Sequence, residues 1–319
     1  MTTYAQLTYE QRCQISALLQ AGLNQTQIAK EIGCSQSTIS REIQRNSGQR
    51  GYRHKQAQHL ATERRQNAVQ PHKMTPDLIN HIESKLHLKW SPEQISGWLS
   101  RAEAISISHE AIYLHVWADK AKGGALYQHL RHQIKGYRNR GAGKGSRGII
   151  NNRVSISERP DIVDTRERVG DWEIDLIIGK GHSGAMVTIV ERNTRYSVAA
   201  VINDKSAATV TEATIALLAP LRDHVFTITA DNGKEFSGHE IIAKALNCEV
   251  YFADPYSSWQ RGLNENTNGL LRQYWPKNTD FKTVDSNEVK YVIEQLNHRP
   301  RKVLDYQSPA DIFSAEIKV

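Results

Sequence analysis

The chain has 319 residues, 39% hydrophobic and 24% charged, with a formal net charge of +7 at pH 7. This length allows two or three domains with hydrophobic cores, and no apolar run approaches the ~18 residues that a membrane-spanning helix needs. Three scattered cysteines exclude a disulfide framework and a cysteine-based zinc site, so reduced thiols are expected. The N-terminus lacks the pattern of a signal peptide, which predicts a cytoplasmic protein.

The charge is unevenly distributed along the chain. Residues 1–150 carry 21 Lys/Arg against 10 Asp/Glu, a net charge of +11, whereas residues 151–319 carry 20 against 24, a net charge of −4. A basic front half suggests a part that binds a polyanion, joined to a part with another task. Simple solvation of the basic surface is the alternative.

The segment LTYEQRCQISALLQAGLNQTQIAKEIGCSQSTISREIQRN predicts three helices. Apolar spacing gives a first helix ending near Gly22 and a second over residues 25–32. After a turn at Gly33, Ser35 is expected to cap a third helix that runs to about Arg45. This is the helix-turn-helix pattern, in which the later helix enters the major groove of DNA.

The exposed face of that third helix carries side chains that can bond base edges or phosphates. The expected DNA-binding residues are Gln36, Ser37, Ser40, Arg41, Gln44 and Arg45. A small helical bundle whose polar face meets only water is the alternative.

A second helical unit follows a basic helical connector. Ser91 and Gln94 predict a capping box around Pro92, and Ser108 is expected to cap the next helix. The link between these two helices is long for a tight turn, so DNA contact and a role in packing or dimerisation both stay open. The Gly-rich, basic stretch that comes next is expected to be flexible, and it either tracks along phosphates or is a plain solvated linker.

The rear of the chain predicts a mixed α/β domain. The segments VGDWEIDLIIGK, AMVTIVER and RYSVAAVI are typical of three antiparallel strands. Helices are expected in SAATVTEATIALLAPL, in SGHEIIAKALN behind a Ser237–Glu240 capping box, in WQRGLNENTNGLLRQYW and in NEVKYVIEQLNH, and further strands in HVFTITAD and CEVYFA. This order predicts a sheet covered by helices.

Three carboxylates in this domain are candidates for a shared site. Asp175 lies in the first strand, on the face that Asp171 and Glu173 share, Asp231 ends a later strand, and Glu265 lies in a helix. The crevice beyond the carboxyl ends of strands can hold a ligand. Acids within a few Å of one another repel unless a cation joins them, and hard oxygen ligands suit Mg²⁺ or Mn²⁺. Three acids in loose order also occur by chance, so their context matters.

That context includes four candidate contacts to phosphate or DNA near the acids: Lys234, Asn264, Asn268 and Arg272. Arg272 stands two turns after Glu265 on the same helix face, where it could hold a phosphate; an ordinary surface cation is the alternative. Gly269 costs about 1 kcal/mol relative to alanine in a helix, which favours a reason such as close approach of DNA or helix packing.

Several segments resemble a known family: GDWEIDLIIGK, TADNGKEF, PYSSWQRGLNENTNGLLRQYWPK and LNHRPRKVLDYQSPADIF are similar to the integrase-type catalytic core of bacterial DDE transposases. The resemblance extends over nearly the whole chain to the IS30 family of insertion-sequence transposases. It implies an RNase H-like fold and a catalytic, metal-binding triad of Asp175, Asp231 and Glu265, with two Mg²⁺ ions for which Mn²⁺ can substitute. The family often has His where Asp171 stands, so Asp171 and Glu173 compete for the first place; Asp175 is preferred because it lies mid-strand.

The implied architecture is an α/β RNase H-like (integrase-type) domain preceded by all-α helix-turn-helix domains. The expected segments are a helix-turn-helix domain (1–50), a basic connector (51–74), a second helical domain (75–134), a basic linker (135–159) and the catalytic domain (160–319).

The implied function is DNA transposition: binding of terminal inverted repeats, metal-dependent strand cleavage and strand transfer. The expected partners are double-stranded DNA, as inverted repeats and target, and further copies of the chain in a dimer or higher oligomer. The implied location is the bacterial cytoplasm, with the nucleoid when bound to DNA. An inactive DNA-binding regulator with a dimerising RNase H-like domain and a nuclease that cuts without joining are the alternatives.

Overall fold

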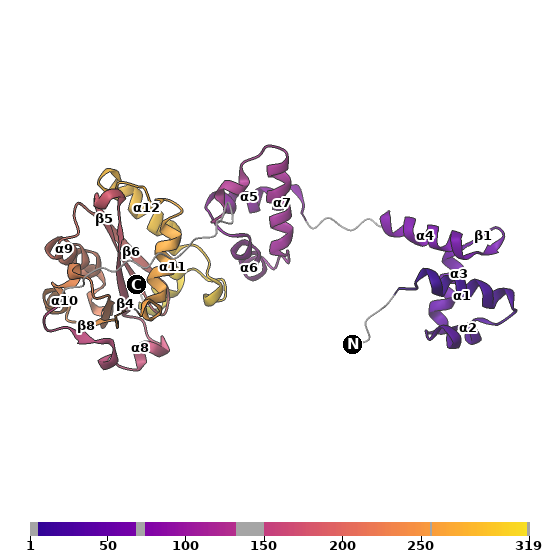
Figure 1. Cartoon of the computed structure of the whole chain (residues 1–319), viewed down its shortest axis with the longest axis horizontal. Coiled ribbons are helices and arrows are strands. Elements are labelled where there is room, and N and C mark those ends of the chain that lie inside the picture. The colour runs from indigo at the N-terminus through magenta and orange to yellow at the C-terminus, as the bar shows by residue number, and fades with distance from the viewer. Residues whose placement is uncertain (1–5, 68–73, 132–149, 256, 318–319) are drawn as a thin grey trace. The chain divides into compact units, whose positions relative to one another are not determined.

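The computed structural model describes residues 6–67, 74–131, 150–255 and 257–317, and the chain falls into two compact units, Met1–Lys73 and Met74–Val319 (Figure 1). Much of the predicted basic linker lies outside the described residues. Within the described ranges, no helix combines the length and the apolar character that crossing a membrane requires.

The first unit is helical. It consists of α1 (Tyr9–Gln20), α2 (Gln25–Ile32), α3 (Gln36–Asn46), a hairpin of β1 (Ser47–Gly48) and β2 (Gly51–Tyr52), and α4 (His54–Gln66). Helix α2 ends at Gly33 in the left-handed region, at φ 75°, and the Ser35 side chain caps α3. The predicted turn between these two helices is therefore present. Ile15, Ile28 and Ile39 are fully buried between the three helices.

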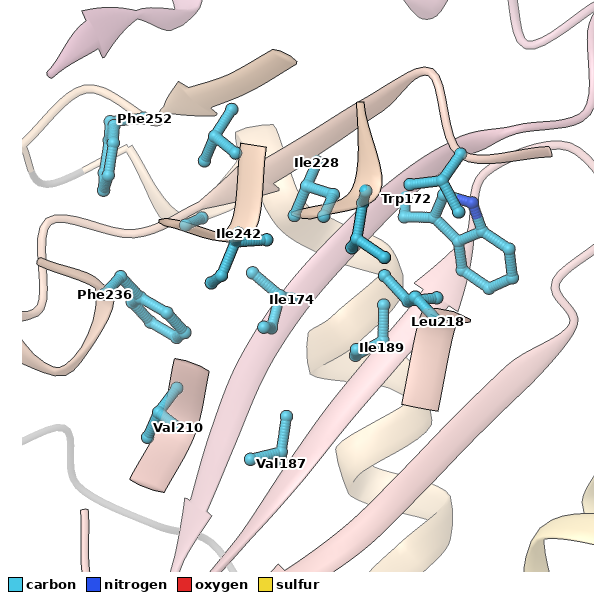
Figure 2. Close-up of a cluster of buried hydrophobic side chains, with 14 of the residues drawn as sticks. Trp172, Ile174, Val187, Ile189, Val210, Leu218, Ile228, Phe236, Ile242 and Phe252 are labelled. Carbon is cyan, nitrogen blue, oxygen red and sulfur yellow. The ribbon is translucent and has the colours of Figure 1, made fainter. Parts of the chain in front are cut away.

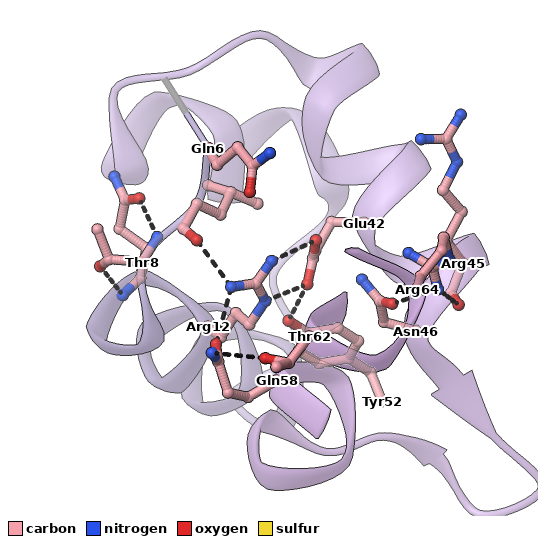
Figure 3. A network of polar contacts seen from close by, with 12 residues as sticks. Gln6, Thr8, Arg12, Glu42, Arg45, Asn46, Tyr52, Gln58, Thr62 and Arg64 are labelled. Carbon is pink, nitrogen blue, oxygen red and sulfur yellow. Dashed lines mark hydrogen bonds and ion pairs between the residues drawn. The ribbon is translucent and has the colours of Figure 1, made fainter. Parts of the chain in front are cut away.

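Helix α4, predicted only as a connector, packs against α1 and α3. The Arg12 guanidinium of α1 connects this helix to α3 and α4. It binds the Glu42 carboxylate of α3 at 2.8 Å and donates to Gln58 of α4 at 2.9 Å (Figure 3). Tyr52 donates to the same carboxylate at 3.0 Å. Because Arg12 and Glu42 are both buried, this network fixes α3 relative to α4.

The second unit begins with three helices, α5 (Pro76–His87), α6 (Pro92–Ala102) and α7 (His109–Ala121), and a 3-10 turn, η1 (Leu126–His129). The predicted capping box of Ser91 and Gln94 is formed, and Ser108 caps α7. Their common core is apolar and consists of Ile82, Leu86, Ile95, Leu99, Ile112 and Val116, all fully buried.

The rest of this unit is built on a six-stranded mixed sheet of β3 (Val154–Ser155), β4 (Asp171–Ile178), β5 (Ala185–Glu191), β6 (Ser197–Ile202), β7 (Thr227–Ala230) and β8 (Glu249–Phe252). The strand order is β3-β8-β7-β4-β5-β6. Strands β4, β5 and β6 form the predicted antiparallel meander, whereas β7, β8 and β3 run parallel to their neighbours. Strand β3, which lies in the predicted linker, has only two residues and so carries no periodic signal.

Helices cover both faces of the sheet (Figure 1): α9 (Ala207–Leu218) and α10 (His239–Leu246) lie on one face, and α11 (Gly262–Leu271) and α12 (Ser286–Asn297) on the other. The short α8 spans Ile162–Thr165, and α13 (Pro309–Ile317) buries Phe313 in the core on the first of these two faces. Alternation along β4 sends Trp172 and Ile174 into the first core (Figure 2) and Ile177 into the second. Asp175 therefore projects from the face that α11 covers.

Two predictions about helix ends are wrong, and one helix has no counterpart among the predicted elements. The Ser237–Glu240 capping box is not formed, because the 3-10 turn η5 (Lys234–Phe236) leaves Ser237 at φ −66° and ψ −14° instead of extended, and α10 starts after Gly238. Helix α11 ends at Leu271, before the predicted Trp275. Helix α13 was not predicted, although Ser308 before Pro309 is a capping signal and the Ser308 hydroxyl accepts from Asp311 N at 3.1 Å.

The outer edge of β6 is covered by a side chain. Asn297 of α12 accepts a hydrogen bond from Ser197 N at 2.9 Å and donates one to Ser197 O at 2.9 Å. Both residues are buried. The amide thus satisfies the outward backbone groups of the edge strand at this position.

Candidate active site

One row of side chains from α11 and the residues that flank it forms hydrogen bonds to β4. Arg261, Asn268 and Arg272 follow at spacings of seven and four residues, which places them on one helix face. Arg261 Nη1 donates to Ile174 O at 3.1 Å, and Arg272 Nη2 donates to Ile178 O at 3.1 Å. Between them, Asn268 Nδ2 donates to the Asp175 carboxylate at 2.8 Å. This face forms one wall of the candidate site.

Asp175 and Asp231 are brought together by a shared cation. Strand β7 runs parallel to β4, and Asp231 directly follows its last residue. Arg261 lies between the two carboxylates, with Nη1 3.3 Å from Asp175 Oδ1 and Nη2 3.3 Å from Asp231 Oδ2. Asp231 Oδ1 also accepts from Gly233 N at 2.7 Å, which fixes its rotamer at the turn.

The environment of Asp175 favours its neutral form. Burial raises the pKa of its carboxyl, the Arg261 guanidinium lowers it, and the negative charge of Asp231 raises it again. Asn268 orients this carboxylate, and the Thr188 hydroxyl supports both residues, 2.9 Å from Asn268 Oδ1 and 3.2 Å from Asp175 O. A strongly oriented carboxylate that is short of positive charge is what a cation site requires.

Glu265 is on the same helix face, four residues after Arg261 and three before Asn268, and its side chain is exposed. In the described part of the chain, no group of three or more His, Cys, Asp or Glu side chains could hold a metal ion. The structure therefore brings Asp175 and Asp231 together but leaves Glu265 outside their cluster, on the helix face that leads to them.

The two competing acids on β4 are engaged elsewhere. Asp171 is buried and receives two bonds from Arg168, at 2.8 and 2.9 Å. Glu173 is fully buried against Arg192, and burial raises the pKa of its carboxyl. Both are closed internal ion pairs, which supports Asp175 as the acid available to a ligand.

The predicted phosphate contacts have different positions. Lys234 is exposed in η5, close in sequence to Asp231. Asn264 is fully buried, its backbone N 3.4 Å from Glu173 Oε2, so its amide is not presented to DNA here, and this expectation requires correction. The Arg272 guanidinium donates to three carbonyls, of Ile178, Trp275 and Pro276, and so holds the turn after α11.

Sequence reasoning missed Arg261 as a site residue. Its signal was available, because it stands one turn before Glu265 and two turns before Asn268 on a single face. It also missed Arg131, whose Nη2 would lie 2.4 Å from a Cβ added at Gly269. An arginine guanidinium thus lies against α11 at Gly269, where a larger side chain would make it shift.

The first unit has a basic surface around α3. Of the predicted DNA-binding residues, Ser40 is partly buried and the others are exposed: Gln36, Ser37, Arg41, Gln44 and Arg45. A cleft of about 340 Å³ between α3 and α4 is lined by Arg41, Arg45, Arg64 and Arg65 among others. Arg64 donates to Arg45 O and to Asn46 Oδ1, each at 2.9 Å (Figure 3). This concentration of guanidinium groups suits a polyanion.

Comparisons with known proteins are consistent over the full length. A family model described as a helix-turn-helix domain matches residues 3–46. The transposase for insertion sequence element IS4351 of Bacteroides fragilis is 45% identical over 96% of this chain and 95% of its own. Transposase InsI for IS30A of Escherichia coli (strain K12) is 39% identical over 97% and 83%, and the transposase for IS1086 of Cupriavidus metallidurans is 37% identical over 98% and 95%.

Among solved structures, the catalytic core domain of BIV integrase is 19% identical, with a TM-score of 0.36, over 47% of this chain and 97% of that chain.

Proposed function

Because the chain belongs to the IS30 family of insertion-sequence transposases, which are DDE-type polynucleotidyl transferases, we propose that it cleaves DNA at the ends of a bacterial insertion sequence and joins those ends to target DNA. The observation that carries this proposal is the pair of carboxylates, Asp175 and Asp231, joined across neighbouring parallel strands by one guanidinium. Residues 160–319 would form the catalytic domain.

Two of the three proposed ligands, Asp175 and Asp231, lie close enough to share one cation, as they share Arg261. Two hard oxygen ligands lie on either side of a positive charge, and burial raises the pKa of Asp175, a cost that a metal ion would offset. Asp175, Asp231 and Glu265 would hold two Mg²⁺ ions, or Mn²⁺ in their place. When bound, the ions would make the nucleophile more acidic and neutralise charge on the phosphate.

The other side chains of the site orient the Asp175 carboxylate and offset the negative charge of the two aspartates. Asn268 keeps the Asp175 carboxylate in one orientation, and the Thr188 hydroxyl acts only indirectly, through the Asn268 amide oxygen and the Asp175 backbone carbonyl. Before substrate arrives, Arg261 offsets the repulsion between the two aspartates. Once its guanidinium is released from these carboxylates, it can bind a phosphate through two parallel hydrogen bonds. Glu265, exposed on the same face, would have to turn toward the aspartates to complete the triad.

The proposed chemistry has two displacements at phosphorus. In the first, a water oxygen attacks the phosphodiester at the element's end and the 3′-oxygen leaves as a hydroxyl. In the second, that 3′-hydroxyl attacks a target phosphodiester and a target 3′-oxygen leaves, so the number of phosphodiester bonds is conserved. Neither step requires a covalent bond to the protein.

Recognition of the terminal inverted repeats is assigned to the first unit. The exposed side chains of α3 would contact base edges, and the arginines of the cleft between α3 and α4 would bind the backbone. Because both ends of the element must meet, a dimer or higher oligomer is expected on DNA.

The test is incubation of labelled element-end DNA with the protein and Mg²⁺, comparing wild type, Asp231→Asn and the exposed control Asp223→Asn. We expect Asp231→Asn to abolish cleavage with nearly unchanged DNA affinity, and Asp223→Asn to behave as wild type. Cleavage by Asp231→Asn would remove that residue from the site. If the wild-type protein binds the DNA but does not cut it, the result would favour a DNA-binding regulator. If it cuts the DNA but does not join the ends to a target, the result would favour a nuclease.

A further inference from the structure

Four cationic side chains gather beside α11, on the helix face next to the one that contacts β4. They are Lys89, from the turn after α5, Arg131, which follows η1, and Arg299 and Arg301, which follow α12. Lys89, Arg131 and Arg299 contact Asn266, Gln273 and Tyr274, at and just beyond α11, whereas Arg301 donates to Leu296 O of α12.

The two outer cations of this group reach α11 directly. Lys89 Nζ donates to Gln273 O at 3.1 Å and lies 3.9 Å from the centre of the Tyr274 ring. Arg131 Nη1 donates to Asn266 Oδ1 at 3.3 Å. Asn266 is the residue after Glu265, so the Arg131 charge lies against α11 beside the position of the proposed catalytic residue, and Lys89 lies further along, just beyond the end of the helix.

The two inner cations, the buried Arg299 and the half-buried Arg301, have no carboxylate partner among the described residues. Arg299 is 1% exposed and donates only to neutral acceptors, Gln273 Oε1 at 3.2 Å, the Tyr274 hydroxyl at 2.9 Å and Leu88 O at 3.5 Å. Arg301 donates to Leu296 O at 3.0 Å, and Nε of both arginines has no hydrogen-bond partner. Within the described ranges, none of the four cations forms an ion pair with Asp or Glu.

This arrangement is electrostatically incomplete. A buried charge without a counter-charge costs several kcal/mol. Burial lowers the pKa of Lys89 and lowers that of Arg301 to about 9, and in each case the charge of Arg299 adds to the effect. Lys89 also has φ 59° after α5, a left-handed position where glycine is usual, so a lysine is kept there against a backbone cost.

We propose that Lys89, Arg131, Arg299 and Arg301 form a binding site for a backbone phosphate of DNA, which holds the strand against α11 beside Glu265. The inference rests on the proposed function for the identity of the anion. Arg299 and Arg301 would contribute positive electrostatic potential at the site. Lys89 and Arg131 would make the direct contacts to the phosphate. A phosphate at this place would supply the missing counter-charge, and at Arg131, which bonds Asn266, it would lie within one helical turn of the proposed third acid.

The test replaces the two outer cations, Lys89→Gln and Arg131→Gln, singly and together, with the exposed lysine change Lys290→Gln as the matched control. Binding of a short duplex of arbitrary sequence is measured over a salt series, since phosphate contacts do not depend on sequence. The slope of log affinity against log salt should fall by about 0.9 for each lost contact, and should not change in the control. Unchanged slopes in the double variant would overturn the inference.

A second measurement needs no variant. Acetylation of Lys89 in the wild-type chain, followed by mass spectrometry, should be slowed by the duplex and not by inorganic phosphate at the same phosphate concentration. Equal protection by both would assign the site to free phosphate, and no protection by either would exclude an anion site; either outcome overturns the inference.

The two proposals fail separately. Cleavage that depends on Asp231, together with unchanged salt slopes, would leave the transposase assignment and remove the phosphate site. Lower slopes in the variants of a protein that never cleaves DNA would leave the phosphate site and remove the catalytic assignment.

Discussion

Arg261 occupies the place between Asp175 and Asp231 where a metal ion is proposed to bind, so it should compete with the metal. Replacing it by glutamine removes the positive charge and retains hydrogen-bonding capacity. In a chelator the two carboxylates of Arg261→Gln then repel without compensation, whereas in Mg²⁺ the ion takes over the role of the guanidinium.

The magnitude follows from the geometry. Unit charges 3.3 Å apart attract by about 5 kcal/mol at an effective dielectric constant of about 20. The side chains of Asp175 and Asp231 are 25% and 41% exposed, so solvent screening reduces each pair to about 1–2 kcal/mol. Loss of both pairs should cost about 2–4 kcal/mol, which is roughly 4–16 °C in Tm for a unit of this size.

The assay is the melting temperature of full-length protein in chelator and in Mg²⁺. At about 100 times its Kd, Mg²⁺ should return about 2.7 kcal/mol to Arg261→Gln. Wild type should gain less, because the ion must first displace Arg261, and calorimetry should give a Kd for Mg²⁺ at least about tenfold lower in the variant. Arg261→Lys, which keeps the charge, and Arg222→Gln, an exposed arginine, serve as controls. An equal response to Mg²⁺ in wild type and Arg261→Gln would refute the competition.

Two further predictions concern Asp175 and its support. Asn268→Ala should lower both the affinity for Mn²⁺ and the cleavage rate by about 10–100-fold, with DNA affinity unchanged, because the Asp175 carboxylate loses its orienting bond; titration calorimetry with Mn²⁺ and a filter-binding assay check this, and an unaltered Mn²⁺ affinity would contradict it. Burial raises the pKa of Asp175, so the folded chain retains this proton to a higher pH than the unfolded chain. Its contribution to stability therefore falls as pH rises above its unfolded pKa of about 3.9 and levels off above the folded pKa. In chelator, the Tm of Asp175→Asn minus that of wild type should grow over this window, and a constant difference would show that the carboxyl is not strained by burial.

Local signals in the sequence predict most elements of the fold. The alternation in β4, β5 and β6 and the caps at Ser35, Ser91 and Ser108 depend only on neighbouring residues, and each is found where expected. Strand β3 is found only in the structure, because two residues have no period and its pairing with β8 is tertiary.

Two acids of the candidate site and the neighbouring Asn268 are predictable from the sequence, whereas the bridging Arg261 and the burial of Asn264 are not. Asp175 and Asp231 stand out by their positions on strands. The burial of Asn264 depends on which face of α11 meets the sheet, and the bridging position of Arg261 depends on the distance between β4 and β7. Neither quantity is encoded in local spacing.

The amide of Asn297 has a consequence for how copies of this protein can assemble. It occupies both outward backbone groups of Ser197, so a strand from a neighbouring molecule cannot extend the sheet at this place on β6. An open edge is a template for strand addition and aggregation. If several copies associate on DNA, as proposed, the Asn297 amide closes the Ser197 end of β6 to sheet extension, and contacts at this place would be made by side chains.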